Sequence, residues 1–133
     1  MSNSKGVPGA PAPATGLLRL WRATGYSLAG LRVAYQEEAA FRQEVWLAMV
    51  LVPAALLLPL PLMGRAFLVA CMLAVLAIEL LNSAVEAVVN LASPGFHPLA
   101  KKAKDAGSAA VLVSLVILAI SWGCALAVIL AGE

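Results

Sequence analysis

Charged side chains are scarce in this sequence. Only 12% of the 133 residues are Asp, Glu, Lys or Arg, and 62% are hydrophobic. An average soluble domain carries about 25% charged residues, so a soluble globule of this composition would expose too much apolar surface. The net charge of +2 is also small for a protein that binds a polyanion. The composition therefore excludes an ordinary soluble domain, a disordered protein and a nucleic-acid-binding protein, and it indicates a membrane protein.

The sequence also has few cysteines, and it lacks the common nucleotide-binding motifs. The two cysteines, Cys71 and Cys124, both lie in apolar runs, so neither a disulfide framework nor a cysteine-based metal site is expected. The sequence has no GxxxxGK[ST] loop, no GxGxxG fingerprint and no HRD or DFG element. If the chain handles a nucleotide, it does so without the machinery of soluble kinases.

The N-terminal part of the chain has two segments of different character. Residues 1–16 are rich in Pro, Gly, Ala and Ser, with Lys5 as the one charge, and we expect a disordered tail without a secretory signal. Residues 17–36 have the periodicity of an amphipathic helix, with Arg19 and Arg22 opposite the apolar face. We expect this helix to lie in the membrane interface; a soluble amphipathic helix is the alternative. The apolar face comprises Leu17, Leu20, Trp21, Leu28, Leu31 and Tyr35.

Three long apolar stretches follow, at residues 45–64, 66–92 and 106–132. A spanning helix needs about 20 apolar residues, so the sequence predicts an all-α membrane protein with three transmembrane helices. Prolines 53, 59 and 61 are expected to kink the first span or end it early. The predicted organisation is one membrane domain over 17–133, with spanning helices at about 40–63, 65–92 and 105–131.

Basic residues indicate the orientation of the chain in the membrane. Arg65 marks the expected turn between the first two spans, and the loop expected at 93–105 carries Lys101, Lys102 and Lys104. Lysine and arginine cluster before the first span and in the 93–105 loop, so the positive-inside rule predicts that both are cytoplasmic.

Two glutamates interrupt the second apolar stretch. Glu79 and Glu86 fall on one helical face together with Asn82, Ser83 and Asn90. A purely structural polar stripe that joins helices would explain the amides and the serine. The glutamates need a proton, a cation or a partner in this setting, and by default they indicate a functional site.

Further charged residues flank this stripe. An acidic pair formed by Glu86 and one of Glu37, Glu38 or Glu44 could hold Mg²⁺ through oxygens. Lys104 could then meet a phosphate, although a KKAKD run also serves as a plain topogenic flank. A different alternative is a small proton- or cation-conducting helix bundle that uses Glu79 and Glu86 as a relay. That function would need acids through the whole membrane thickness, whereas here they stop halfway.

Three sequence segments resemble the bacterial integral-membrane diacylglycerol kinases: EEAAFRQE (37–44), IELLNSAVEAVVN (78–90) and AKDAGSAAV (103–111). The stretch TGYSLAGLR (24–32) fits the surface helix of that family. The resemblance implies an enzyme of the inner membrane, a homotrimer with active sites shared between chains, that uses ATP and Mg²⁺ to phosphorylate diacylglycerol.

The resemblance also implies roles for individual residues. Glu79 is the catalytic base, and Glu38 and Glu86 hold the metal that accompanies ATP. The residues expected to contact the nucleotide are Arg19, Tyr26, Glu38, Glu86, Gly95, Phe96, His97, Lys104 and Asp105. The residues expected to bind or support the substrate are Arg19, Ala40, Glu44, Asn82 and Ser108.

The match to the family is not uniform. Asn90 stands where the family usually has an aspartate, and Gly95 and Pro98 stand where the diacylglycerol enzymes often have glutamates. The run HPLAKKAKD is closer to the related undecaprenol kinases of Gram-positive bacteria. An undecaprenol kinase with the same chemistry is therefore the alternative to a diacylglycerol kinase.

Overall fold

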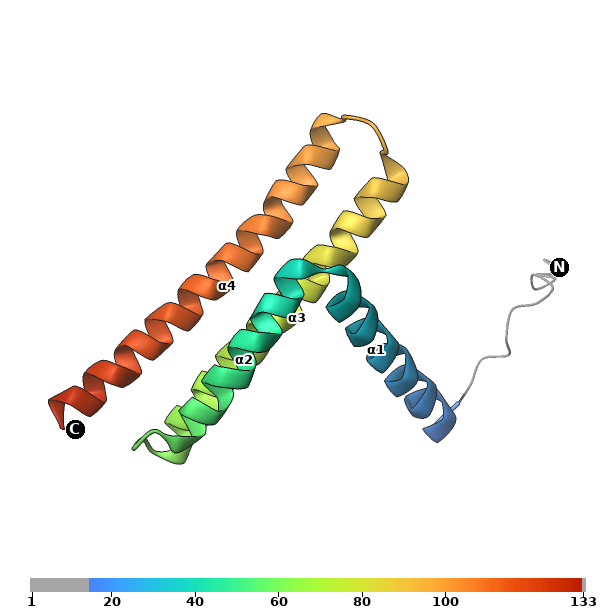
Figure 1. The fold of residues 1–133 in the computed structure, drawn as a ribbon. Coiled ribbons are helices and arrows are strands. Elements are labelled where there is room, and N and C mark those ends of the chain that lie inside the picture. The colour runs from blue at the N-terminus through green and yellow to red at the C-terminus, as the bar shows by residue number, and fades with distance from the viewer. Residues whose placement is uncertain (1–14, 133) are drawn as a thin grey trace, which may run out of the picture. The chain divides into compact units, whose positions relative to one another are not determined.

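The computed structural model describes residues 15–132, so the tail predicted at residues 1–16 lies outside it except for residues 15 and 16. These residues form four helices and no strand (Figure 1). They are α1 (Leu17–Glu37), α2 (Ala39–Leu57), α3 (Leu62–Ala92) and α4 (Pro98–Ala131). The helical class predicted from the sequence is confirmed. The chain divides after Arg32 into two units, which are described separately.

The first unit is α1 up to Arg32. Large apolar side chains, among them Leu17, Trp21 and Leu28, are exposed on it. The hydroxyls of Thr24 and Ser27 donate hydrogen bonds to carbonyls one turn back, so these polar groups are satisfied within the helix. An exposed apolar face is what an interfacial helix requires; the location of α1 at a membrane surface stays a prediction.

The second unit is built around α3, which contacts both α2 and α4. Its core contains Met72 and Val75, both fully buried, and Leu118 of α4 packs against them. A second apolar cluster near the α2–α3 turn contains Ala55 and Leu60. These contacts fix which face of α3 is turned toward its neighbours, and Glu79 lies on the same face one turn beyond Val75.

Three helices are long and apolar enough to span a membrane, as predicted. The 19 residues of α2 correspond to about 28 Å, close to the hydrocarbon thickness of about 30 Å. The 31 residues of α3 and 34 of α4 correspond to about 46 and 51 Å. Figure 1 shows α2 beginning part-way along α3, so the connected ends of α3 and α4 extend beyond the start of α2.

The α2–α3 turn lies at residues 58–61 rather than at Arg65, and α2 ends at Leu57 rather than near residue 63. Prolines 59 and 61 cannot donate backbone hydrogen bonds, so the helix stops before them. Arg65 lies in α3. Its Nε donates to the Leu60 carbonyl at 2.8 Å and its Nη1 to the Leu56 carbonyl at 3.3 Å. Arg65 thereby satisfies one carbonyl in the last turn of α2 and one in the α2–α3 turn.

The loop expected at 93–105 is shorter, because α4 begins at Pro98 rather than near residue 105. His97 is the N-cap, and its Nδ1 accepts a hydrogen bond from the Leu99 amide at 3.2 Å. Proline suits the first helical position because no hydrogen-bond donor is needed there. Lys101, Lys104 and Asp105 are consequently helical residues with fixed relative positions.

Candidate functional site

A cavity of about 280 Å³ lies where α3 and α4 meet the start of α2. We call it the acid cavity because Glu38, Glu79 and Glu86 line it. The remaining lining residues are Ala40, Asn82, Ser108 and Val111. The predicted base, both predicted metal ligands and three of the predicted supporting residues therefore share one cavity.

Glu38 reaches the acid cavity because the chain leaves the helical conformation at this residue. Its φ of −101° and ψ of 110° are extended, and its side chain does not cap α2. Across this junction, Nη1 of Arg42 donates to the carbonyls of Tyr35 at 3.0 Å and Gln36 at 2.8 Å. Arg42 thus satisfies the last carbonyls of α1 and leaves the neighbouring carboxylates free to bind other groups.

The acids of α2 and α3 form a cluster of negative charge. Glu79 is 4% exposed and Glu44 is 8% exposed. Glu79 is close enough to Glu38, Glu44 and Glu86 for their charges to repel. None of these carboxylates forms an ion pair with a lysine or arginine within residues 15–132. A proton or a cation is needed to relieve this repulsion.

Gly107 of α4 brings the two long helices close together at the acid cavity. A Cβ at this position would collide with Oδ1 of Asn82 and would lie 3.9 Å from the Asn82 Cα. The buried Oδ1 of Asn82 has no hydrogen-bond partner among the described residues. Glycine at position 107 therefore makes room for the Asn82 side chain between α3 and α4.

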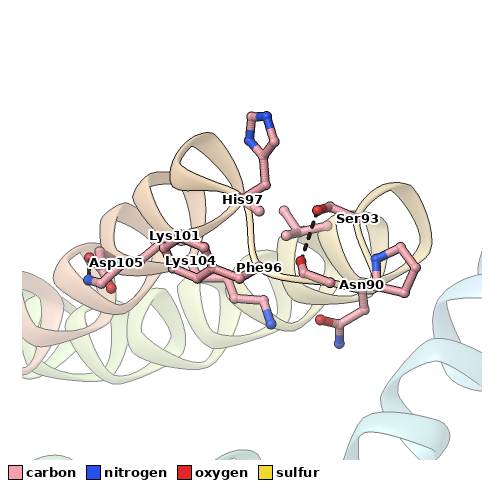
Figure 2. A pocket seen from close by; sticks show the side chains of 11 residues that line it. Asn90, Ser93, Phe96, His97, Lys101, Lys104 and Asp105 are labelled. Atoms are coloured by element: carbon pink, nitrogen blue, oxygen red, sulfur yellow. Dashed lines mark hydrogen bonds and ion pairs between the residues drawn. The ribbon is translucent and has the colours of Figure 1, made fainter.

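A second cavity, of about 400 Å³, lies at the α3–α4 loop (Figure 2). We call it the lysine cavity because Lys101 and Lys104 line it. Asn90 of α3 and Asp105 of α4 also line it. Its other lining residues are Val89, Ser93, Pro94, Gly95, Phe96, His97 and Ala100. The predicted nucleotide contacts Gly95, Phe96, His97, Lys104 and Asp105 are thus brought together in one place.

The two cavities follow each other along the same pair of helices. Asn90 lies one helical turn beyond Glu86 on α3, and Lys104 lies one turn before Ser108 on α4. One turn is about 5.4 Å, so the facing ends of the two cavities lie about this far apart along the helices. This arrangement pairs a cationic cavity at the loop with an anionic cavity nearer the membrane-spanning part of α3.

The comparisons with known proteins identify the family. A match to prokaryotic diacylglycerol kinase covers residues 25–126. A diacylglycerol kinase of Pseudomonas aeruginosa is 52% identical over 81% of this chain and 88% of its own length. The chain belongs to the prokaryotic diacylglycerol kinase family. The diacylglycerol kinase of Escherichia coli K12 is 43% identical over 81% of this chain and 88% of its own, and that of Haemophilus influenzae is 44% identical over 82% and 92%.

Membership of this kinase family confirms the family predicted from the motifs, and the chain is an enzyme. Among residues 15–132, no group of three His, Cys, Asp or Glu side chains is arranged to hold a metal ion. Two carboxylates nevertheless suit Mg²⁺ in a kinase, because this ion keeps several waters and takes further oxygens from the substrate phosphates. Glu38 and Glu86 both line the acid cavity and are the residues that would hold the ion.

Three predicted residues of the kinase lie outside the two cavities. Arg19 and Tyr26 belong to α1, where both are exposed. Glu44 lies on α2 and is buried, with no hydrogen-bond partner for its Oε2 among the described residues. Their roles stay predictions.

The sequence reasoning missed Val111 as an acid-cavity residue, and Asn90, Ser93 and Lys101 as lysine-cavity residues. Lys101 is four residues before Asp105. In a helix that begins at Pro98, this spacing places Lys101 and Asp105 on the same face, and it is the signal that identifies Lys101 as a residue of the cavity.

Proposed function

We propose that the chain transfers the γ-phosphoryl group of ATP to the primary hydroxyl of diacylglycerol, which yields phosphatidic acid. The acid cavity carries this proposal, because carboxylates of two segments meet there without a basic partner among the described residues. Intramembrane carboxylates are costly and are by default functional. The relatives support the choice of acceptor, since those of Pseudomonas aeruginosa and Escherichia coli are both named diacylglycerol kinase.

Glu79 is the general base in this proposal. It is the most buried of the three acids in the cavity and lies on the apolar helix α3, where the hydroxyl of a membrane lipid can approach it. It accepts the hydroxyl proton while the hydroxyl oxygen bonds to the γ-phosphorus. The bond from this phosphorus to the β–γ bridging oxygen breaks, and ADP leaves. A positioned base contributes about 10²–10⁴-fold to the rate.

Glu38 and Glu86 would hold the Mg²⁺ that accompanies ATP; a bound magnesium ion neutralises charge on the phosphates during transfer. Lys104 contacts a phosphate as a point charge from the adjoining lysine cavity. Asp105 and the loop residues Gly95, Phe96 and His97 contact the rest of the nucleotide. The family resemblance assigns nucleotide contacts to Arg19 and Tyr26 as well, and support of the substrates to Ala40, Glu44, Asn82 and Ser108.

The lengths of the helices support an orientation in the bacterial inner membrane. If α2 spans the hydrocarbon, the connected ends of α3 and α4 extend into water on the side where α2 begins. Lys101, Lys102 and Lys104 lie at this end, and the positive-inside rule assigns such a cluster to the cytoplasm. The lysine cavity would then face cytoplasmic ATP, with the acid cavity at the membrane surface.

The family resemblance further predicts a homotrimer with active sites shared between chains and an interfacial position for α1. Many large apolar side chains of the spanning helices are exposed, such as Leu73, Val113 and Ile120, and lipid or neighbouring chains must cover them. Cross-linking of the protein in detergent distinguishes a trimer from a monomer.

The ion-conducting bundle is less well supported than a kinase. Beyond Glu79, toward the far side of the membrane, the same face of α3 carries Val75 and Met72, which are fully buried and apolar. They block a polar path at this level, and an ion relay would need polar groups there. An undecaprenol kinase shares the proposed chemistry and differs in the acceptor.

A coupled assay of ATP consumption with dispersed diacylglycerol tests the proposal. We expect turnover with the unsubstituted protein, a loss of at least about 100-fold in kcat for Glu79→Gln, and retained binding of MgATP by this variant. Near-normal turnover of Glu79→Gln would contradict the assignment of the base. Turnover with undecaprenol and none with diacylglycerol would contradict the acceptor.

A further inference from the structure

Lys101 is a charged residue of the lysine cavity to which the proposed mechanism gives no role. It lies one turn after the N-cap of α4 and lines the cavity together with Lys104 and Asp105. Lys102 is exposed and does not line the cavity. The cavity wall thus includes two of the three lysines of this segment.

Among the described residues, one of the two lysines that line the lysine cavity is paired with a carboxylate and the other is not. Lys101 forms an ion pair with Asp105, and this is the one ion pair in the described range. Lys104 therefore has no carboxylate partner there. Figure 2 shows Lys101 turned toward Asp105, while the Lys104 side chain extends toward the side where Asn90 lies. The loop that closes the cavity contributes Ser93 and Gly95 but no carboxylate.

The Lys101–Asp105 pair is weak enough to exchange partners. Both side chains are more than 60% exposed, at 62% and 64%. Ion pairs at such exposure contribute little to stability, because water screens them and holding two long side chains costs entropy. A multiply charged anion that enters the cavity offers Lys101 a stronger partner than a single exposed carboxylate.

We propose that Lys101 is a second phosphate-binding lysine, which Asp105 holds at the rim of the cavity until a polyphosphate enters. The incoming anion then takes Lys101 from Asp105, and the released carboxylate is free to bind another part of the nucleotide. The ligand class is a nucleoside triphosphate, recognised through its phosphates. This inference rests on the proposed function, since it assumes that the lysine cavity receives ATP.

Equilibrium binding of MgATP to the full chain in detergent, without a lipid acceptor, tests the inference. We expect Lys101→Ala to weaken binding about three- to tenfold, with a smaller dependence of affinity on salt than in the unsubstituted protein. Lys102→Ala is the matched control, because it removes the same charge one residue away but outside the cavity. We expect the affinity of Lys102→Ala for MgATP to stay within about twofold of that of the unsubstituted protein.

Competition by inorganic tripolyphosphate identifies the part of the nucleotide that Lys101 contacts. We expect Lys101→Ala to lose tripolyphosphate affinity by the same factor as MgATP affinity. Equal binding by the Lys101 and Lys102 variants, or a loss confined to MgATP, would overturn the inference and leave the proposed function intact. Failure of the unsubstituted protein to bind MgATP would overturn both.

Discussion

At the scale of single residues, the acid cavity depends on the absence of a side chain at position 107. The Asn82 amide occupies the space that a Cβ of residue 107 would need. Asn82 lies three residues after Glu79 and four before Glu86, on the same face of α3. A displacement of this amide would therefore change the surroundings of both glutamates.

Gly107→Ala is expected to lower kcat by about tenfold or more, because a Cβ at this position displaces the Asn82 amide, and small misplacements near reacting groups reduce the rate strongly. Gly123→Ala is the control, since no atom lies within 4 Å of a Cβ at position 123 on the same helix. The ATP-consumption assay measures the turnover of both variants, and the two rates are compared. Equal activities would show that the close approach at Gly107 has no catalytic importance.

At the scale of the elements, arginines hold both ends of α2. Arg42 donates to the last carbonyls of α1, and Arg65 of α3 donates to the Leu56 and Leu60 carbonyls at the other end. Hydrogen bonds from a charged donor contribute about 1.5–3 kcal/mol. The two arginines differ in surroundings, because only Arg42 is near the acid cavity: its backbone amide donates to the Glu38 carbonyl at 3.1 Å.

Arg42→Gln is expected to raise the Mg²⁺ concentration needed for half-maximal activity about three- to tenfold, because the junction that positions Glu38 loses charged hydrogen bonds. Arg65→Gln removes similar bonds far from the cavity. We expect it to lower thermal stability while leaving the Mg²⁺ requirement unchanged. Titration of Mg²⁺ at saturating ATP measures the effect, and identical requirements in both variants would contradict the positioning role of Arg42.

The sequence predicted the helices better than their ends. Long apolar runs were enough to predict three spanning helices. The helical period of about 3.6 residues was enough to predict that Glu79, Asn82 and Glu86 lie on one face. The prediction of a loop up to residue 105 is wrong because the three lysines belong to α4, whose N-terminus is formed by His97 and Pro98. The Gly107–Asn82 approach depends on the rotation of α4 about its axis, which no local pattern reveals.

At the scale of the whole molecule, the spanning helices differ in length. The α2 helix nearly matches the hydrocarbon thickness, whereas α3 and α4 exceed it by more than 15 Å on the estimate of about 1.5 Å per residue. The acid cavity is at the start of α2 and the lysine cavity is at the connected ends of the longer helices. If α2 spans the hydrocarbon as proposed, this shortest helix sets the height of the acid cavity relative to the lipid surface.

With the proposed orientation, this difference in length predicts that hydrophobic mismatch affects the activity of the enzyme. In a bilayer thicker than α2, the helix ends sink below the headgroups or the lipid thins around them, and the acid cavity is pulled away from water. We expect kcat in vesicles to be highest with phosphatidylcholines whose hydrocarbon is about 30 Å thick and to fall as acyl chains lengthen. A rate independent of chain length would contradict this dependence. If the rate instead falls with chain length as expected, membrane thickness acts on the reaction as directly as the concentration of either substrate.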